Sequence, residues 1–169
     1  LTVLAKDNTD VKNIQDFNVF RSTFIYDSSA PVTFIGIPSN GAMNSQLNSI
    51  SGTMADEPTY TEAGKASVGI DQTQITIQAM SGTNQGKYYN GAGGWPSTNP
   101  YWISVATQAG TPATWSFPAQ GQSVPSWEHG VLYWIVARSS DRANNVESIY
   151  ELGTDSRSAT FDLYAPSAA

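Results

Sequence analysis

The sequence predicts an all-β protein folded as a sandwich of two sheets, with about seven to nine strands and no helix. Charged residues make up only 13% of the 169 residues, well below the share of about 25% that is usual in soluble domains. Thr, Val, Ile, Tyr and Trp are frequent instead, and these residues fit the pleated, half-buried face of a sheet. Short apolar or alternating runs recur between clusters of Gly, Pro, Asn and Ser, and no stretch has a sustained helical period.

Two strands are expected soon after residue 31. Residues 32–37 form an apolar run that stops at the Pro-Ser-Asn-Gly cluster of residues 38–41, where Pro and Gly favour a turn. Residues 47–54 are expected to form the second strand. The polar and acidic segment 55–66 that follows is expected to be a loop.

The clearest strand signal lies at residues 74–80. Ile75 and Ile77 alternate there with Gln and Thr, as expected of a strand with one face in the core and one in solvent. A Lys-Tyr-Tyr run then leads into Asn90 and Gly91. Asn-Gly after a short apolar run is the strongest local signal for a β-hairpin, so we expect a return strand after it.

Four further strands are expected toward the C-terminus, at residues 101–106, 114–117, 131–138 and 160–163. Residues 131–138 are apolar on both faces, which is typical of a central strand covered on each side. Three tryptophans of this half are expected in the core, namely Trp115, Trp127 and Trp134.

An internal repeat predicts the domain organisation. Residues 1–15 align without gaps with residues 133–147, and the Ala-Pro pair at Ala30 and Pro31 returns near the C-terminus. We therefore expect residues 1–29 to be the two closing strands of a preceding module and residues 30–169 to be a complete module.

The start of the chain supports the same division. The chain has no initiator Met and opens within an expected strand, so the parent polypeptide is expected to continue upstream. In an isolated chain, residues 1–29 would lack a sheet to complete. They could then pair with the free edge of another copy.

Four stretches of the chain carry motifs of a known family. They are Ile-Ser-Gly-Thr at residues 50–53, Gln-Ile-Thr-Ile at 74–77, Tyr-Tyr-Asn-Gly-Ala-Gly-Gly-Trp at 88–95, and the segment 134–147 that ends in Asp-Arg-Ala-Asn-Asn-Val-Glu. They resemble the bacterial immunoglobulin-like (Ig-like) repeats of giant surface proteins, and the resemblance covers most of the complete module. The sequence departs from that family in two places. Asn144 stands where the family usually has Gly, and the loop before residue 67 is longer than usual.

The resemblance implies an Ig-like sandwich, export to the cell surface or the medium, and tandem copies. Its partners would be neighbouring copies in a longer chain or filament, together with a glycan or another cell-surface ligand. By analogy, the function would be that of a non-catalytic structural or adhesive module, acting as a spacer, stalk or filament unit.

Charge and composition argue against several other classes of protein. The net charge is −6 and the sequence pI is about 4.5, so the phosphate backbone of a nucleic acid would be repelled. The absence of Cys removes disulfides, thiolate nucleophiles and Cys-ligated zinc. No apolar run is long enough to span a membrane, and residues 1–6 do not resemble a signal peptide.

Catalysis finds little support, and no catalytic residue is assigned. His129 is the only histidine and is expected to be a loop residue. A glycosidase would need Glu128 to face a second carboxylate about 5 to 10 Å away. The candidates for that second carboxylate are Asp56, Glu57 and Glu62.

A calcium site is the one cofactor that the sequence suggests. Asp141, Asn144 and Asn145 lie in one turn, and calcium takes hard oxygen ligands of this kind. The alternative is a plain turn, because Asp and Asn also dominate turns through hydrogen bonds to the neighbouring backbone. A calcium ion near a joint between modules would stiffen an array.

Carbohydrate binding is the main alternative function. Exposed aromatic rings with polar edges are suited to stacking on sugars. Five such residues crowd around the expected hairpin, namely Tyr88, Tyr89, Trp95, Tyr101 and Trp102. The competing interpretation is that Trp95 and Trp102 cap the sandwich core.

Overall fold

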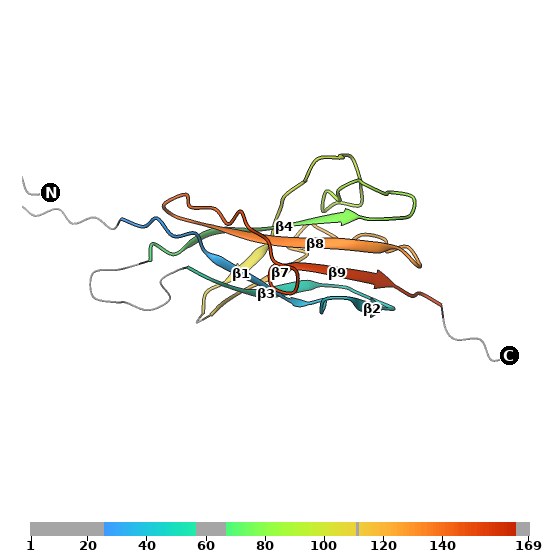
Figure 1. Cartoon of the computed structure of the whole chain (residues 1–169), viewed down its shortest axis with the longest axis horizontal. Helices are drawn as coiled ribbons and strands as arrows, with labels where there is room; N and C mark the ends of the chain where they lie inside the picture. Colours follow the sequence, from blue (N-terminus) through green and yellow to red (C-terminus); the bar gives the residue numbers. More distant parts are fainter. Residues whose placement is uncertain (1–25, 57–66, 111, 165–169) are drawn as a thin grey trace, which may run out of the picture.

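The structure is a computed structural model that describes residues 26–56, 67–110 and 112–164 (Figure 1). In these residues nine strands form two sheets, and no helix is present. The four-stranded sheet has the order β1 (Val32–Ile37), β3 (Ile50–Ala55), β7 (Ala113–Phe117) and β6 (Ala106–Gln108). The five-stranded sheet has the order β2 (Ala42–Asn44), β9 (Ser156–Phe161), β8 (Leu132–Asp141), β4 (Ile70–Ala79) and β5 (Ile103–Ser104). The predicted all-β, two-sheet class is confirmed.

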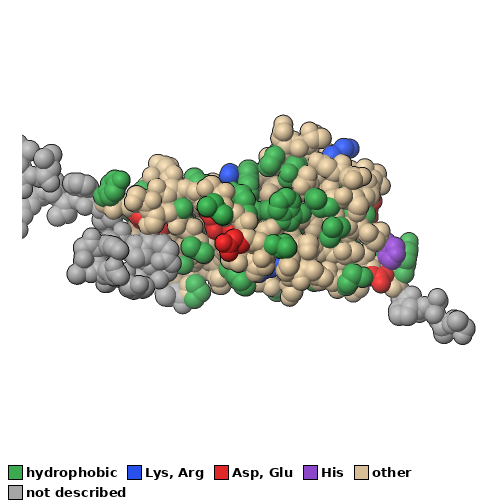
Figure 2. All heavy atoms as spheres, viewed as in Figure 1, with side chains coloured by type: hydrophobic (Ala, Val, Ile, Leu, Met, Phe, Trp, Pro, Cys, Tyr) green, Lys and Arg blue, Asp and Glu red, His purple; other side chains and the backbone are tan. Residues whose placement is uncertain are grey.

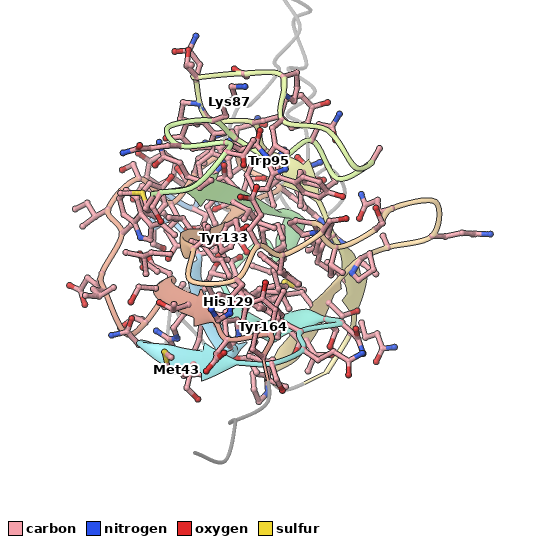
Figure 3. The ribbon with its side chains drawn as sticks, turned by 90° about the vertical axis from the view of Figure 1, so that its right-hand side faces the viewer. Met43, Lys87, Trp95, His129, Tyr133 and Tyr164 are labelled. Atoms are coloured by element: carbon pink, nitrogen blue, oxygen red, sulfur yellow. The ribbon has the colours of Figure 1, made fainter. Side chains whose placement is uncertain are left out.

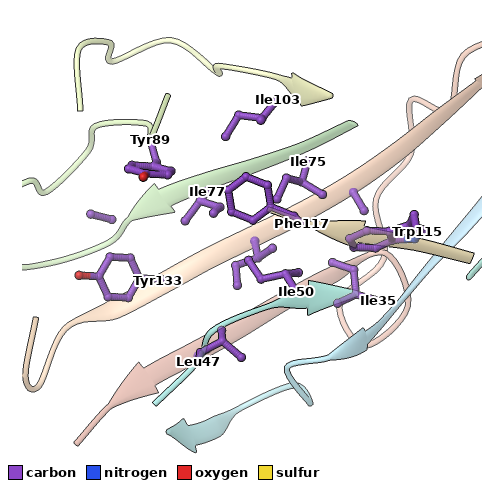
Figure 4. Packing of buried hydrophobic residues seen from close by; sticks show 14 of the residues in the cluster. Ile35, Leu47, Ile50, Ile75, Ile77, Tyr89, Ile103, Trp115, Phe117 and Tyr133 are labelled. Carbon is purple, nitrogen blue, oxygen red and sulfur yellow. The ribbon is translucent and has the colours of Figure 1, made fainter. Parts of the chain in front are cut away.

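The core lies between the sheets and is filled by alternate residues of the long strands (Figure 4). Ile35 and Ile50 enter it from the four-stranded sheet, and Ile75, Ile77 and Ile135 enter it from the five-stranded sheet. All five are fully buried. Burial of apolar surface contributes roughly 25 cal/mol per Å², so this layer holds the two sheets together.

The three tryptophans expected in the core differ in their burial. Trp115 is only 2% exposed, and half-buried Trp127 stacks on Phe161 with ring centroids 4.3 Å apart. The prediction is wrong for Trp134, which is 40% exposed. Successive residues of a strand point to opposite faces, and because buried Tyr133 points into the core, Trp134 points out of the sandwich.

Most predicted strands are present, with shifted ends, but the region after β4 differs from the prediction. Tyr88 forms only isolated bridges to Gln78 and Ser97, so no regular return strand follows the Asn-Gly pair. The strand expected at residues 101–106 is divided, because β5 pairs with β4 while β6 pairs with β7 of the other sheet. The short strand β2, which pairs in parallel with β9, was not predicted.

The described chain enters the sandwich at one end and leaves it at the other (Figure 1). Residues 26–31 lie at the entry end, together with the turn that follows β8. β9 runs toward the opposite end, where the described chain stops at Tyr164. Residues 1–25, which hold most of the two expected N-terminal strands, lie outside the described residues.

The part of the chain that the structure describes contains no helix able to cross a lipid bilayer.

Candidate functional site

Three carboxylates meet at the entry end of the sandwich. Asp27 lies in the segment that leads into β1, Asp56 directly follows β3, and Asp141 is the last residue of β8. One oxygen of each side chain lies within 4.8 Å of an oxygen of the other two. The cluster therefore joins the entering segment to both sheets, and we call it the carboxylate cluster.

The turn after β8 positions Asp141 and links it to the entering segment. Asp141 Oδ1 accepts hydrogen bonds from the backbone N–H groups of Ala143 (2.8 Å) and Asn145 (2.9 Å). The side-chain amide of Asn145 donates to Asp141 Oδ2 (2.7 Å) and to the backbone oxygen of Asp27 (3.1 Å). Asn145 therefore holds the entering segment against the turn.

Asp56 is the least satisfied member of the cluster. Its side chain is 7% exposed, and its Oδ2 accepts the backbone N–H of Gly69 at 2.6 Å. Its Oδ1 is buried and has no hydrogen-bond partner. Burial raises the pKa of Asp56, and the nearby charges of Asp27 and Asp141 raise it further.

Asp27 is better satisfied. Its Oδ1 accepts the hydroxyl and the backbone N–H of Ser29, and its Oδ2 accepts the backbone N–H of Val68 at 3.1 Å. The hydrogen bonds from Ser29 lower the pKa of Asp27. These hydrogen bonds favour the charged form of the Asp27 carboxylate.

No Lys or Arg within residues 26–56, 67–110 and 112–164 forms an ion pair with the cluster. Arg142 comes near through its backbone N–H, which donates to the carbonyl of Gly69, but its side chain is exposed. An uncompensated buried carboxylate is costly unless it is protonated or binds a cation. Clustered carboxylate oxygens fit calcium, which takes six to eight oxygen ligands. Asp56 Oδ1, which has no hydrogen-bond partner, is an oxygen atom that could serve as one of these ligands.

The predicted metal residues contribute in three different ways. Asp141 is a member of the cluster, and Asn145 orients Asp141 and Asp27. Asn144 is exposed and shapes the turn, with a φ of 66°. Reasoning from the sequence missed Asp27 and Asp56. The available signal was the position of Asp27, which lies three residues before the Ala-Pro pair at the expected boundary between modules.

The five predicted sugar-binding residues separate into three groups. Tyr89 is fully buried, and Trp95 packs against the core with its ring centroid 5.2 Å from that of Tyr89. Tyr101 is 43% exposed. Tyr88 and Trp102 line a small pocket on the outer face of the five-stranded sheet. These last two residues therefore line one pocket together.

Of the acidic pairs considered for glycosidase chemistry, the pair of Glu128 and Asp56 does not form. The backbone N–H of Glu128 donates to the hydroxyl of Tyr133 near the start of β8, whereas Asp56 lies beside Asp141 at its end. At a rise of about 3.3 Å per residue, Tyr133 and Asp141 are about 25 Å apart along β8, well beyond the roughly 5 to 10 Å that the chemistry needs. The alternative partners Glu57 and Glu62 lie outside the described residues.

His129 lies at the exit end of the module. Its ring is next to that of Tyr164, with centroids 4.1 Å apart (Figure 3). Its Nδ1 lies 3.3 Å from Asp162 Oδ1 and accepts the backbone N–H of Leu163. These contacts secure the end of β9 on the sandwich.

No protein-family model matches the chain, and no curated protein sequence shows significant similarity to it.

Proposed function

We propose that the chain is a non-catalytic structural or adhesive module of a longer extracellular protein, and that a calcium ion fixes each module to the segment that precedes it. The observation that carries the proposal is the meeting of Asp27, from the entering segment, with Asp56 and Asp141 of the sandwich. The cation would bind only where the segment and the module are docked. Its binding energy would therefore oppose bending at the joint.

The shape of the module supports this role. A chain that enters at one end and leaves at the other can continue from module to module in a line (Figure 1). Pro31, which directly precedes β1, has a restricted φ and further limits motion at the joint. The resemblance to bacterial Ig-like repeats rests on the quoted motifs and points to the same arrangement.

A bound calcium ion would offset the negative charge of the three carboxylates, and the protein would supply the ligands and hold them in position. Asp27, Asp56 and Asp141 would hold the ion, and Asn145 would orient two of them. Because Asp56 Oδ1 has no partner within the protein, we expect it to gain the most from a bound cation.

Thermal unfolding of the full chain with and without calcium tests the metal site. A ligand at 100 times its Kd stabilises the folded state by about 2.7 kcal/mol, which raises the Tm of a domain of this size by about 5–10 °C. Asp56→Asn should abolish this shift. In calcium-free buffer the same variant should be at least as stable as the wild type, because it removes a buried charge beside two others.

Asp162→Asn is the matched control, because it neutralises an exposed carboxylate at the other end of the module. It should keep the full calcium shift. An absent shift in the wild type, or an equal shift in Asp56→Asn, would refute the metal site. The repeat role further requires that the parent polypeptide contain more copies of the segment from Asp27 to Pro31.

A further inference from the structure

A small pocket lies on the outer face of the five-stranded sheet, away from the carboxylate cluster. Its floor consists of two cross-strand pairs of β4 and β8, namely Thr76 opposite Val136 and Gln78 opposite Trp134. Aromatic rings from the flanking loops form its walls, and its volume is about 120 Å³. Hydrophobic side chains gather over the middle of these two strands (Figure 2).

The rings around the pocket are held in place. Trp134 Nε1 donates to the hydroxyl of Ser156, which fixes the orientation of the indole. The guanidinium of Arg138 lies 3.8 Å from the centre of the Trp102 ring and is itself bonded to Gln74 Oε1. A preorganised aromatic surface loses little conformational entropy when a ligand binds.

Tyr150 completes the wall beside Trp102, with ring centroids 5.9 Å apart. It comes from the segment between β8 and β9, whereas Trp102 precedes β5. Trp134 remains 40% exposed although it is one of the largest apolar side chains. Three separate segments thus form the pocket, and its largest ring is left partly exposed to solvent. Such a pocket is suited to binding a ligand.

The floor of the pocket contains an unsatisfied hydroxyl. Thr76 is only 5% exposed, and its Oγ1 has no hydrogen-bond partner. A buried hydroxyl without a partner destabilises a protein, whereas Val in the same place would not. Thr76 therefore contributes nothing to stability through this group, and a polar ligand atom would satisfy it.

The size and chemistry of the pocket favour one sugar ring. The volume lies well below the roughly 300–1,000 Å³ of sites for larger ligands. A pyranose ring presents C–H groups to aromatic faces and hydroxyls that both donate and accept. It could therefore satisfy the hydroxyl of Thr76 and donate to the amide oxygen of Gln78, whose Nε2 donates to the carbonyl of Gly86. The net charge of −6 disfavours acidic sugars.

A proline-rich peptide is the competing occupant, because aromatic grooves also bind such segments. The N–H groups of Trp134 and Gln78 are already bonded to Ser156 and Gly86, however, and a proline residue has no N–H to donate to the amide oxygen of Gln78. We propose that the pocket formed by Thr76, Gln78, Trp102, Trp134 and Tyr150 binds a neutral pyranose ring of a glycan. This site does not depend on the carboxylate cluster or on calcium.

Tryptophan fluorescence and saturation-transfer NMR on the full chain test the proposal. The probes are the methyl pyranosides of glucose, galactose, mannose and N-acetylglucosamine, and a polyproline peptide is the competing probe. Ligand size predicts saturable binding of at least one sugar with a Kd of about 1 mM. Trp102→Ala should weaken it by more than about tenfold.

Thr76→Val separates a binding role from a structural one. The variant should weaken sugar binding by about fivefold to tenfold while leaving the Tm unchanged or higher. Tyr101→Ala is the control, because Tyr101 is exposed next to Trp102 in sequence but lies outside the pocket. It should bind as the wild type does.

Three results would overturn the proposal. They are no saturable binding of any sugar in the panel, sugar binding that survives both Thr76→Val and Trp102→Ala, and binding of the polyproline peptide in place of the sugars.

Discussion

At the scale of single residues, Gly52 is the position where the fold leaves least room. It lies in the Ile-Ser-Gly-Thr stretch of β3, opposite Ile35 of β1. A Cβ added at Gly52 would lie 1.8 Å from the backbone oxygen of Phe34 and 2.9 Å from the ring of Trp115. The glycine is needed because β1 and the Trp115 ring both approach the backbone of β3 closely.

Gly52→Ala is therefore expected to destabilise the protein by about 3 kcal/mol, since the clash is with backbone and a core ring that cannot move independently. Urea unfolding measures the change. Gly36→Ala is the matched control within the same strand pair, because its Cβ would meet no atom closer than 3.7 Å. Equal losses of stability in the two variants would contradict the steric explanation.

At the scale of the strands, a buried polar network ties the two sheets together. Glu147 accepts the backbone N–H of Thr33 in β1 through Oε1 and that of Ser139 in β8 through Oε2. The hydroxyl of Thr33 donates to that of Ser139, which also contacts the hydroxyl of Thr73 in β4. Edge strand β1 is thereby attached to the opposite sheet by hydrogen bonds as well as by apolar contact.

Stability should depend on pH through Glu147. Burial raises its pKa, and the charge of Asp155 raises it further. The folded state then holds the proton more tightly than the unfolded chain. The stabilisation is present below the unfolded pKa of about 4.3 and is lost as the pH rises through the raised folded value.

Urea unfolding between about pH 4.5 and neutrality measures this dependence. The free energy of unfolding should fall as the pH rises through this window, because the folded state must then lose a proton that it binds more tightly than the unfolded chain does. Glu147→Gln should flatten the slope but not remove it, because burial also raises the pKa values of Asp155 and Asp56. Asp71→Asn, which neutralises an exposed carboxylate, should keep the wild-type slope. An unchanged slope in Glu147→Gln would show that another group dominates.

The strands could be predicted from the sequence where one face is polar. The alternation around Ile75 and Ile77 identified β4 because its outward residues are Gln and Thr. β8 is apolar on both faces, so its alternation did not show which residues point inward, and Trp134 was assigned to the wrong face. The division of residues 101–106 between the two sheets depends on tertiary pairing, which no local pattern records.

At the scale of the whole molecule, the carboxylate cluster could be predicted only in part, because two of its three members reach it through the fold and not through their position in the sequence. The turn around Asp141 and Asn145 was recognisable as a candidate metal site because its polar residues are consecutive. Asp27 and Asp56 join it only because β1, β3 and β8 all begin or end at the entry end of the sandwich. Asn144 adopts the left-handed conformation in this turn, with a φ of 66°, which Asn tolerates better than most residues.

The same contacts predict how the entering segment behaves. Asp27 binds the amide of Val68 through its side chain, and its backbone oxygen accepts a hydrogen bond from Asn145. Asp27→Ala removes the first contact and one carboxylate of the cluster. Hydrogen exchange at Val68 should then accelerate by roughly tenfold, whereas exchange in the core of β8, at Ile135, should not change.

Adding calcium to this exchange experiment should show whether the cation acts on the docking of the entering segment. In the wild type, calcium should slow exchange at Val68 further, because the cation would bind only the docked joint. In Asp27→Ala it should have a much weaker effect, since one of the three carboxylates is gone. If calcium slowed exchange equally at Val68 in both proteins, Asp27 would not be a ligand, and the cation could not connect the entering segment to the module.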